Sequence, residues 1–272
     1  MCLMPDSPVL RRVSIDSPAK INLHLEIGLP RRDGYHDLTS LFAMIDLKDD
    51  LTVEETDGPV DTCEIAGPFD FPPRDNLIYK ACSAFRRASG YRKGLRVTVL
   101  KRIPEQAGLG GGSGNAAGVL KAMNLLAGGL SEQTALTKAD LKEAALEVGS
   151  DVPFFLDGPV SLVGGRGERL EQVEVREDLG HFPVLIILPH VSVSTGEAYR
   201  RLDERRKTGR SVEERSSIPH AEIVSMYRGK EPDAWTFFNS FTPVLREIYP
   251  LYDELIEEIS RLKPLFYELS GS

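Results

Sequence analysis

Hydrophobic residues recur along this chain with two different periods, and each period predicts a type of element. Residues 95–99 alternate between apolar and polar side chains, which is typical of a half-buried strand. In residues 116–127 apolar side chains return every three or four positions, which predicts an amphipathic helix that stops at Gly128. Five glycines fall in residues 108–114, between these two elements. The predicted order is strand, long loop, glycines, helix.

A second alternating segment lies near the start of the chain. Residues 21–27 alternate between aliphatic and polar side chains, which predicts another half-buried strand. The two-residue period places Lys20, Asn22 and His24 on one face of this strand and the aliphatic side chains on the other.

Five more segments complete the coarse pattern. Residues 74–85 predict an amphipathic helix, residues 137–148 a capped helix, and residues 164–168 a turn between two strands. The aliphatic residues 184–188, flanked by prolines, predict a buried strand. Residues 200–217 carry charges of both signs without apolar periodicity, which predicts an exposed helix end and a mobile loop. This mixture favours the α+β class.

Composition narrows the class of protein. The 272 residues are enough for one large core or two smaller ones, and 41% hydrophobic with 27% charged residues is ordinary for a globular protein. A net charge of −8 argues against a nucleic-acid partner. The longest apolar run is too short to cross a bilayer, and the first residues lack the apolar core of a signal peptide. We therefore expect a cytoplasmic protein without a membrane partner.

Cysteine and histidine usage adds little chemistry. Cys2, Cys63 and Cys82 are widely spaced and form no Cys-x-x-Cys pair, so we expect reduced thiols. The five histidines form no metal-binding pattern such as His-Glu-x-x-His, and the metal ligands, if any, stay unknown from the sequence.

The glycine-rich segment predicts a phosphate-binding loop. Glycine lets the backbone adopt positive φ and approach a ligand closely, so that successive amides converge on one anion. The start of the following helix adds unpaired N–H groups and a partial positive charge. A ligand-free flexible loop is the plain alternative, and the apolar stripe that follows at once disfavours it.

Two common phosphate loops do not fit. A nucleoside-triphosphatase loop ends in Gly-Lys-Ser/Thr, and no lysine follows Gly112. Residues 112–117 match Gly-x-Gly-x-x-Ala, but the dinucleotide fingerprint needs a tight turn directly off a strand, and here the strand ends near Leu100. The acidic residue at a suitable distance, Glu132, lies in a predicted loop or helix start rather than after a strand.

The segment closely resembles the central motif of the small-molecule kinases that include galactokinase, homoserine kinase, mevalonate kinase and phosphomevalonate kinase. Pro104, Gly108-Leu-Gly110 and Ala116-Ala117 match this motif, whereas Gly114 replaces a serine. The resemblance implies ATP and Mg²⁺ as cofactors and a two-domain α+β kinase fold with an active-site cleft between the domains. The ATP-binding residues that it implies are Pro104, Glu105, Gln106, Ala107, Gly108, Leu109, Gly110, Gly111, Gly112, Ser113 and Gly114.

The resemblance also implies domain boundaries. An N-terminal kinase domain would span residues 1–160 and a C-terminal domain residues 161–272. Glu268-Leu-Ser-Gly271 resembles the start of the family's third glycine motif, so we expect the second domain to be truncated at that motif.

Two further motifs resemble the catalytic residues of the family. Lys20 lies in Pro-Ala-Lys-Ile-Asn-Leu and Asp151 in Gly-Ser-Asp-Val-Pro-Phe-Phe, both similar to motifs of one branch. The resemblance implies that Asp151 accepts a proton from the substrate hydroxyl while Lys20 holds the same oxygen. Without this resemblance, Lys20 would be interpreted as an ordinary strand lysine and Asp151 as a turn or capping aspartate.

The same branch acts on a cytidine-diphosphate-linked methylerythritol, and Asp33-Gly-Tyr-His36 is similar to its cytidine-binding motif. Tyr35 can stack on a base and His36 can hydrogen-bond a base edge. The resemblance adds Asn22, Thr195 and Tyr199 as substrate contacts. It implies a small-molecule partner and a monomer or homodimer.

Weaker resemblances and alternatives remain open. Asn76 and Lys101 would lie near the adenine, although Asn76 is equally a helix cap. A kinase of the same family acting on mevalonate or homoserine, or a nucleotide-binding relative without catalysis, would share the glycine loop.

Overall fold

The structure, a computed structural model, describes residues 11–59, 62–69, 72–129, 135–175, 182–189, 194–208 and 217–271. The chain forms two compact units: unit 1 comprises Met1–Lys20 and Met44–Gly158, and unit 2 comprises Ile21–Ala43 and Pro159–Ser272. The change of unit after Gly158 lies next to the boundary expected at residue 160. Residues 21–43 belong to unit 2, although the sequence placed them in the first domain, because two long strands contribute residues to both units.

The sheet of unit 1 explains the alternating pattern near residue 97. Strand β2 (His36–Thr56) pairs with β1 (Arg12–Pro30) and, antiparallel, with β4 (Gly94–Leu100) from Asp50↔Leu100 to Thr56↔Gly94. The short strand β3 (Cys63–Ala66) runs parallel to β4, with Cys63 opposite Leu95. Leu95, Val97 and Val99 are buried, which confirms the predicted half-buried strand.

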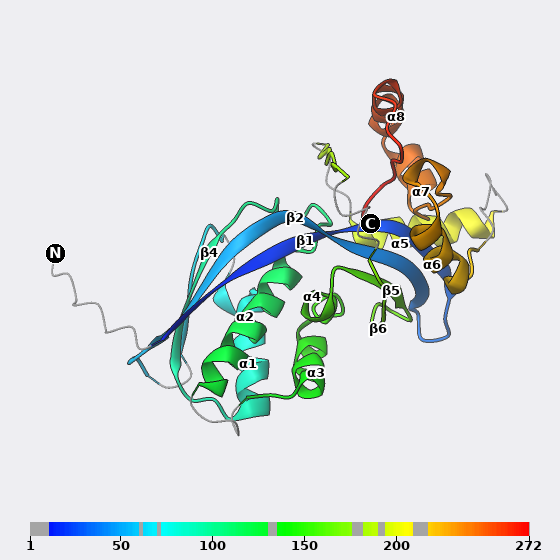
Figure 1. Ribbon diagram of the computed structural model, residues 1–272. Helices are drawn as coiled ribbons and strands as arrows, with labels where there is room; N and C mark the ends of the chain where they lie inside the picture. The colour runs from blue at the N-terminus through cyan, green and yellow to red at the C-terminus, as the bar shows by residue number, and fades with distance from the viewer. Residues whose placement is uncertain are drawn as a thin grey trace. The chain divides into compact units, whose positions relative to one another are not determined.

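Helices cover one side of these strands in Figure 1, where α1 and α2 lie side by side. Their bounds are η1 (Pro73–Asp75), α1 (Leu77–Ser89), α2 (Gly111–Gly128), α3 (Lys138–Val148) and α4 (Phe154–Asp157). Asn76 caps α1 by accepting a hydrogen bond from the Ile78 N–H at 2.9 Å. Thr137 caps α3 in the same way through the Asp140 N–H at 3.2 Å. Both predicted helices are confirmed.

Unit 2 combines a small sheet with helices. Strand β5 (Val160–Gly164) pairs antiparallel with the first part of β2 and with β6 (Arg169–Gln172), which confirms the predicted turn at residues 164–168. The helices are α5 (Thr195–Lys207), α6 (His220–Gly229), η3 (Pro232–Ala234), α7 (Thr242–Ile248) and α8 (Leu251–Arg261). One core gathers Leu41, Ile223 and Phe237, and another gathers Ile27, Phe241 and Leu245.

One prediction for this unit needs correction, and another is confirmed in part. Residues 184–188 are not a buried strand: residues 182–189 adopt no regular structure, and the side chains of Val184 and Leu185 are 51% and 71% exposed. An apolar run cannot by itself specify a pairing partner. Residues 200–207 form the C-terminal part of α5, which ends at Lys207, so the predicted helix end is confirmed, although Leu202 is buried there rather than exposed.

Some expectations lie outside the described residues: those for Cys2, for Glu132 and for residues 209–216. Among the helices of the described ranges, none combines the length and the apolar character needed to span a membrane.

Candidate functional site

The glycine loop of unit 1 ends in a helix that starts earlier than the apolar pattern suggests. Helix α2 begins at Gly111, so three of the five glycines lie in its first turn. Gln106, Gly108 and Gly110 turn the preceding chain with φ of 56°, 70° and 68°. The Gly114 N–H donates to the Gly110 carbonyl at 2.8 Å, whereas the three amides before it have no acceptor within the helix. Such amides form an anion site.

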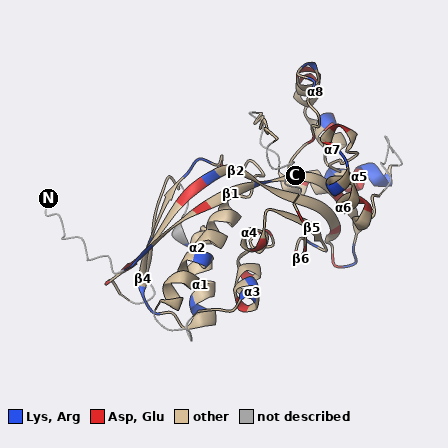
Figure 2. Ribbon diagram, viewed as in Figure 1, with Lys and Arg blue, Asp and Glu red and all other residues tan. Residues whose placement is uncertain are grey.

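Charge at this helix start favours a phosphate. No acidic side chain lies in the first turn of α2, and Lys121 is the only charged residue along the helix (Figure 2). The partial positive charge of the helix N-terminus therefore acts without a nearby carboxylate on the same helix.

We call Gly110 and the first turn of α2 the glycine cradle. Close packing explains why glycine occupies positions 110 and 111 of this cradle. A Cβ atom at Gly110 would lie 2.9 Å from Phe155 Cζ and 3.0 Å from Lys20 Cγ. At Gly111 it would lie 3.0 Å from Ile103 Cγ2. The backbone therefore approaches these side chains more closely than any other residue allows.

Lys20 joins strand β1 to the glycine loop. Its N–H donates to the Leu109 carbonyl at 2.9 Å, and its side chain is only 5% exposed. Burial lowers the pKa of Lys20, and the negative charge of Asp151 partly opposes this effect. The negative charge of Asp151 is therefore close enough to act on the Lys20 ammonium.

Asp151 lies in the turn between α3 and α4 and is half-buried. The turn is closed by the Val152 N–H, which donates to the Gly149 carbonyl at 3.1 Å. Pro153 occupies the N-cap position of α4 and Gly149 the C-cap of α3, so Asp151 caps neither helix.

A second group of predicted residues lies within unit 2. The His36 and Tyr199 rings have centroids 5.0 Å apart, and Tyr199 in turn packs edge-on against Phe241 at 4.9 Å. His36 Nε2 lies 2.9 Å from Asp203 Oδ1, a partner that sequence reasoning missed. Asp203 is one helical turn beyond Tyr199 on α5, a spacing that could have indicated it.

The other predicted substrate contacts of unit 2 have separate surroundings. The Tyr35 side chain is 56% exposed, and the Arg166 guanidinium lies 5.0 Å from its ring centroid. Thr195 is exposed at the first position of α5. Asn22 is buried, and its side-chain amide donates to Ser40 Oγ at 3.0 Å. The structure thus clusters His36 with Tyr199 but not with Tyr35.

Comparison with known proteins places the chain in a family. Residues 76–159 match the model described as GHMP kinases N terminal domain. The 4-diphosphocytidyl-2-C-methyl-D-erythritol kinase of Treponema pallidum (strain Nichols) is 34% identical over 97% of this chain and 88% of its own length. That of Alkaliphilus metalliredigens is 34% identical over 97% and 84%, respectively. The chain belongs to this kinase family.

Solved structures agree with that assignment. A crystal structure of 4-(cytidine 5'-diphospho)-2C-methyl-D-erythritol kinase covers 95% of this chain and 87% of its own, with a TM-score of 0.72 and 32% identity. A mevalonate kinase from Methanococcus jannaschii has a TM-score of 0.53 at 12% identity over 97% of this chain and 89% of its own, and shows the shared fold alone. The predicted α+β kinase fold is confirmed.

Gly114 is the departure of this kinase from the family motif, and the structure gives a reason for it. A Cβ atom there would lie 2.9 Å from both the Pro18 carbonyl oxygen and Ser17 Oγ. Strand β1 therefore approaches α2 too closely for a side chain at position 114. Ser17 is buried, and its hydroxyl has no hydrogen-bond partner among the described residues.

A buried aspartate that the sequence did not single out lies beside the glycine loop of the kinase. Asp49 is fully buried and accepts from Lys101 Nζ at 2.5 Å and from the N–H groups of Arg102 and Ile103 at 2.7 and 2.8 Å. A Cβ atom on Gly111 would lie 3.2 Å from Lys101 Nζ, so this ammonium stands beside the first turn of α2. Asp49 thereby holds both the loop and its lysine.

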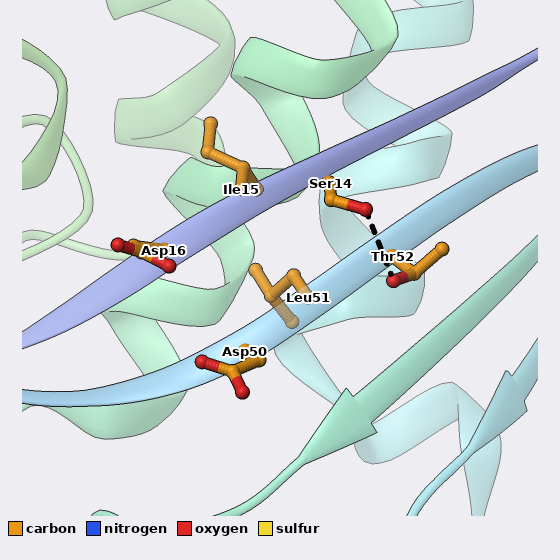
Figure 3. A pocket seen from close by; sticks show the side chains of 6 residues that line it. All are labelled: Ser14, Ile15, Asp16, Asp50, Leu51 and Thr52. Atoms are coloured by element: carbon orange, nitrogen blue, oxygen red, sulfur yellow. Dashed lines mark hydrogen bonds between the residues drawn. The ribbon is translucent and has the colours of Figure 1, made fainter.

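A separate depression of about 710 Å³ lies on strands β1 and β2 of the kinase (Figure 3). It is lined by Ser14, Ile15, Asp16, Asp50, Leu51 and Thr52, and contains none of the predicted site residues. Its two carboxylates would repel a triphosphate. Among the described residues, no group of three or more His, Cys, Asp or Glu side chains could hold a metal ion.

Proposed function

We propose that this chain transfers the γ-phosphoryl group of ATP to the 2-hydroxyl of 4-diphosphocytidyl-2-C-methyl-D-erythritol, a step of non-mevalonate isoprenoid synthesis. The names of its relatives identify kinases of this compound. The observation that carries the proposal is the buried Lys20, bonded through its backbone to the glycine loop and acted on by the charge of Asp151.

The residues present fit a nucleoside triphosphate. The cradle has no room for a Cβ at Gly110 or Gly111, leaves amides of the first turn without helical acceptors, and has Lys101 beside it. Amide donors and a lysine are the groups that bind phosphate oxygens in kinases. Mg²⁺, when bound, would neutralise the phosphate charge. The Ser113 hydroxyl is the candidate ligand within the glycine loop.

Lys20 and Asp151 supply the groups for the transfer itself. The Asp151 carboxylate accepts the proton of the substrate hydroxyl as the new oxygen–phosphorus bond forms, while the bond between the γ-phosphorus and the bridging oxygen breaks and ADP leaves. The Lys20 ammonium holds that oxygen and offsets negative charge. Phosphoryl transfer rests mainly on positioning and electrostatics, so these two side chains and an amide cradle suffice.

The aromatic cluster of unit 2 supports the cytidine part of the proposal. Tyr199 offers a ring face for stacking, and His36 a ring nitrogen for the edge of the base. Asp203 orients the His36 ring through its contact with Nε2, which leaves Nδ1 for the ligand. Asn22, Tyr35 and Thr195 remain proposed contacts.

The proposal is tested by ADP release coupled to a spectroscopic readout, with ATP and Mg²⁺ and one acceptor at a time. We expect turnover with the cytidyl substrate and none with mevalonate or homoserine. Free cytidine nucleotides should inhibit competitively against the acceptor.

Each rival gives a different result in the same assay. Turnover with mevalonate or homoserine, unaffected by cytidine nucleotides, would assign the chain to another branch. ATP binding in a thermal-shift assay without turnover of any acceptor would identify a nucleotide-binding relative without catalysis.

A further inference from the structure

Two cysteines that are far apart in the sequence meet in unit 1. Cys63 lies on β3 and Cys82 on α1, 19 residues later, and their sulfur atoms are 3.3 Å apart. Cys63 is partly exposed, whereas Cys82 is fully buried. The sequence alone gave no reason to pair them, because they form no Cys-x-x-Cys motif.

The surroundings give the two thiols unequal reactivity. Arg86 follows Cys82 by one turn of α1, and its guanidinium donates to the carbonyl of Thr62, next to Cys63, at 2.7 Å. The hydrogen bond from Cys82 and the charge of Arg86 lower the pKa of Cys63 despite its burial. The hydrogen bond to Cys63 and burial raise the pKa of Cys82. Thiolate character and access favour Cys63 as the attacking group.

We propose that Cys63 and Cys82 are a peroxide-sensitive thiol pair that closes reversibly into a disulfide between β3 and α1. Cys63 is the attacking thiol and Cys82 the resolving thiol. Nothing in the proposed kinase reaction uses either sulfur, so this is a modification site distinct from the nucleotide cradle.

The chemistry balances with a peroxide as the oxidant. The Cys63 thiolate attacks one peroxide oxygen, an S–O bond forms as the O–O bond breaks, and hydroxide leaves. The Cys82 sulfur then attacks Cys63 Sγ, an S–S bond forms, and the sulfenic oxygen leaves as water with the thiol proton. In sum, two thiols lose two electrons and one hydrogen peroxide becomes two waters.

The sulfur positions suit this closure. A disulfide requires an S–S distance of about 2.05 Å, so the sulfurs need to approach by little more than 1 Å. Because β3 is a short strand, paired with β4 in the described residues, it can follow this movement.

The test uses the full chain carrying Cys2→Ser, so that only the two proposed thiols remain. After treatment with hydrogen peroxide we expect both free thiols to disappear together. The mass should fall by two hydrogens, and a peptide pair containing residues 63 and 82 should be cross-linked. A dithiol reductant should restore both thiols, and the oxidised form should melt roughly 5 °C higher.

Two matched variants assign the roles of the sulfurs. In Cys82→Ala, Cys63 should accumulate as a sulfenic acid that dimedone traps, because no resolving thiol is present. In Cys63→Ser, the buried Cys82 should stay unmodified at the same peroxide concentration. Over-oxidation of Cys63 without a cross-link in the parent, or equal reactivity of Cys82 in Cys63→Ser, would overturn the proposal.

Discussion

At the scale of single residues, the buried charge of Lys20 destabilises the folded protein. Burial in the fold lowers its pKa, so the folded state binds fewer protons than the unfolded chain between the lowered and the ordinary value. The charge therefore opposes folding fully below the folded-state pKa. This cost disappears as pH rises towards the ordinary lysine value. A residue of this kind is typical of an active site rather than of a structural ion pair.

We predict that Lys20→Met loses phosphoryl transfer by at least about a hundredfold while its melting temperature stays equal or rises. The methionine fills similar space without a buried charge. Activity comes from the coupled ADP assay and stability from thermal unfolding at pH 7.

The matched control is Asp151→Asn, which removes the opposing charge and leaves the Lys20 ammonium buried without it. This variant should also lose about a hundredfold in kcat, but its melting temperature should fall. A strongly reduced melting temperature for Lys20→Met would show that the lysine is a net stabilising group.

Gly114 carries a second prediction at this scale. Gly114→Ser introduces the serine of the motif that this segment resembles, yet we expect it to lower the free energy of unfolding by about 1–3 kcal/mol, because its Cβ meets the Pro18 carbonyl. Urea unfolding measures the change. Gly112→Ser is the control, since its Cβ would meet only Leu77 Cδ1 at an ordinary 3.6 Å. Equal stability of the two variants would contradict the packing argument.

At the scale of elements, the loop between β4 and α2 depends on one buried carboxylate. Asp49 binds two successive amides at the start of the loop and the Lys101 ammonium. Hydrogen bonds to a charged group are worth about 1.5–3 kcal/mol, more than those between neutral groups. The loop is therefore held at its strand end by Asp49 and at its helix end by the bond between Leu109 and Lys20.

Asp49→Asn should raise KM for ATP roughly tenfold, about 1.4 kcal/mol, with a smaller effect on KM for the acceptor. The amide keeps an acceptor for the backbone but loses the charge that positions Lys101. Asp50→Asn is the neighbouring control: its partner Arg102 is on the surface, where an ion pair contributes little. If both variants had the same KM for ATP, Asp49 would have no positioning role.

At the scale of the whole molecule, the protein groups that we propose to bind the two ligands are divided between the two compact units. Unit 1 contains the glycine cradle, Lys20 and Asp151, and unit 2 contains His36 and Tyr199. Each ligand should therefore slow the hydrogen exchange of a different set of backbone amides.

We predict that an ATP analogue with Mg²⁺ slows hydrogen exchange in residues 103–114, whereas a cytidine nucleotide slows it around His36 and along the start of α5. Amides that gain an acceptor exchange more slowly. Exchange followed by mass spectrometry resolves these peptides. Protection of the same peptides by both ligands would contradict the division of roles.

The sequence determined the features that depend on near neighbours. Periodicity located β4, α1, α2 and α3, because apolar spacing reflects the geometry of a single element. The motifs indicated the nucleotide loop and the family. Local reasoning placed the start of α2 too late, because glycine has no side chain to contribute to an apolar pattern.

Only the tertiary structure decided which distant residues meet. Asp49 and Lys101 are 52 residues apart, His36 and Asp203 are 167 apart, and no periodicity links such positions. The aliphatic residues 184–188 have the composition of a buried strand, yet they are mostly exposed. A strand becomes buried only when it pairs with another strand, and the run itself does not specify that partner. Contacts between elements follow from how whole strands and helices pack, and that information is spread over the entire chain.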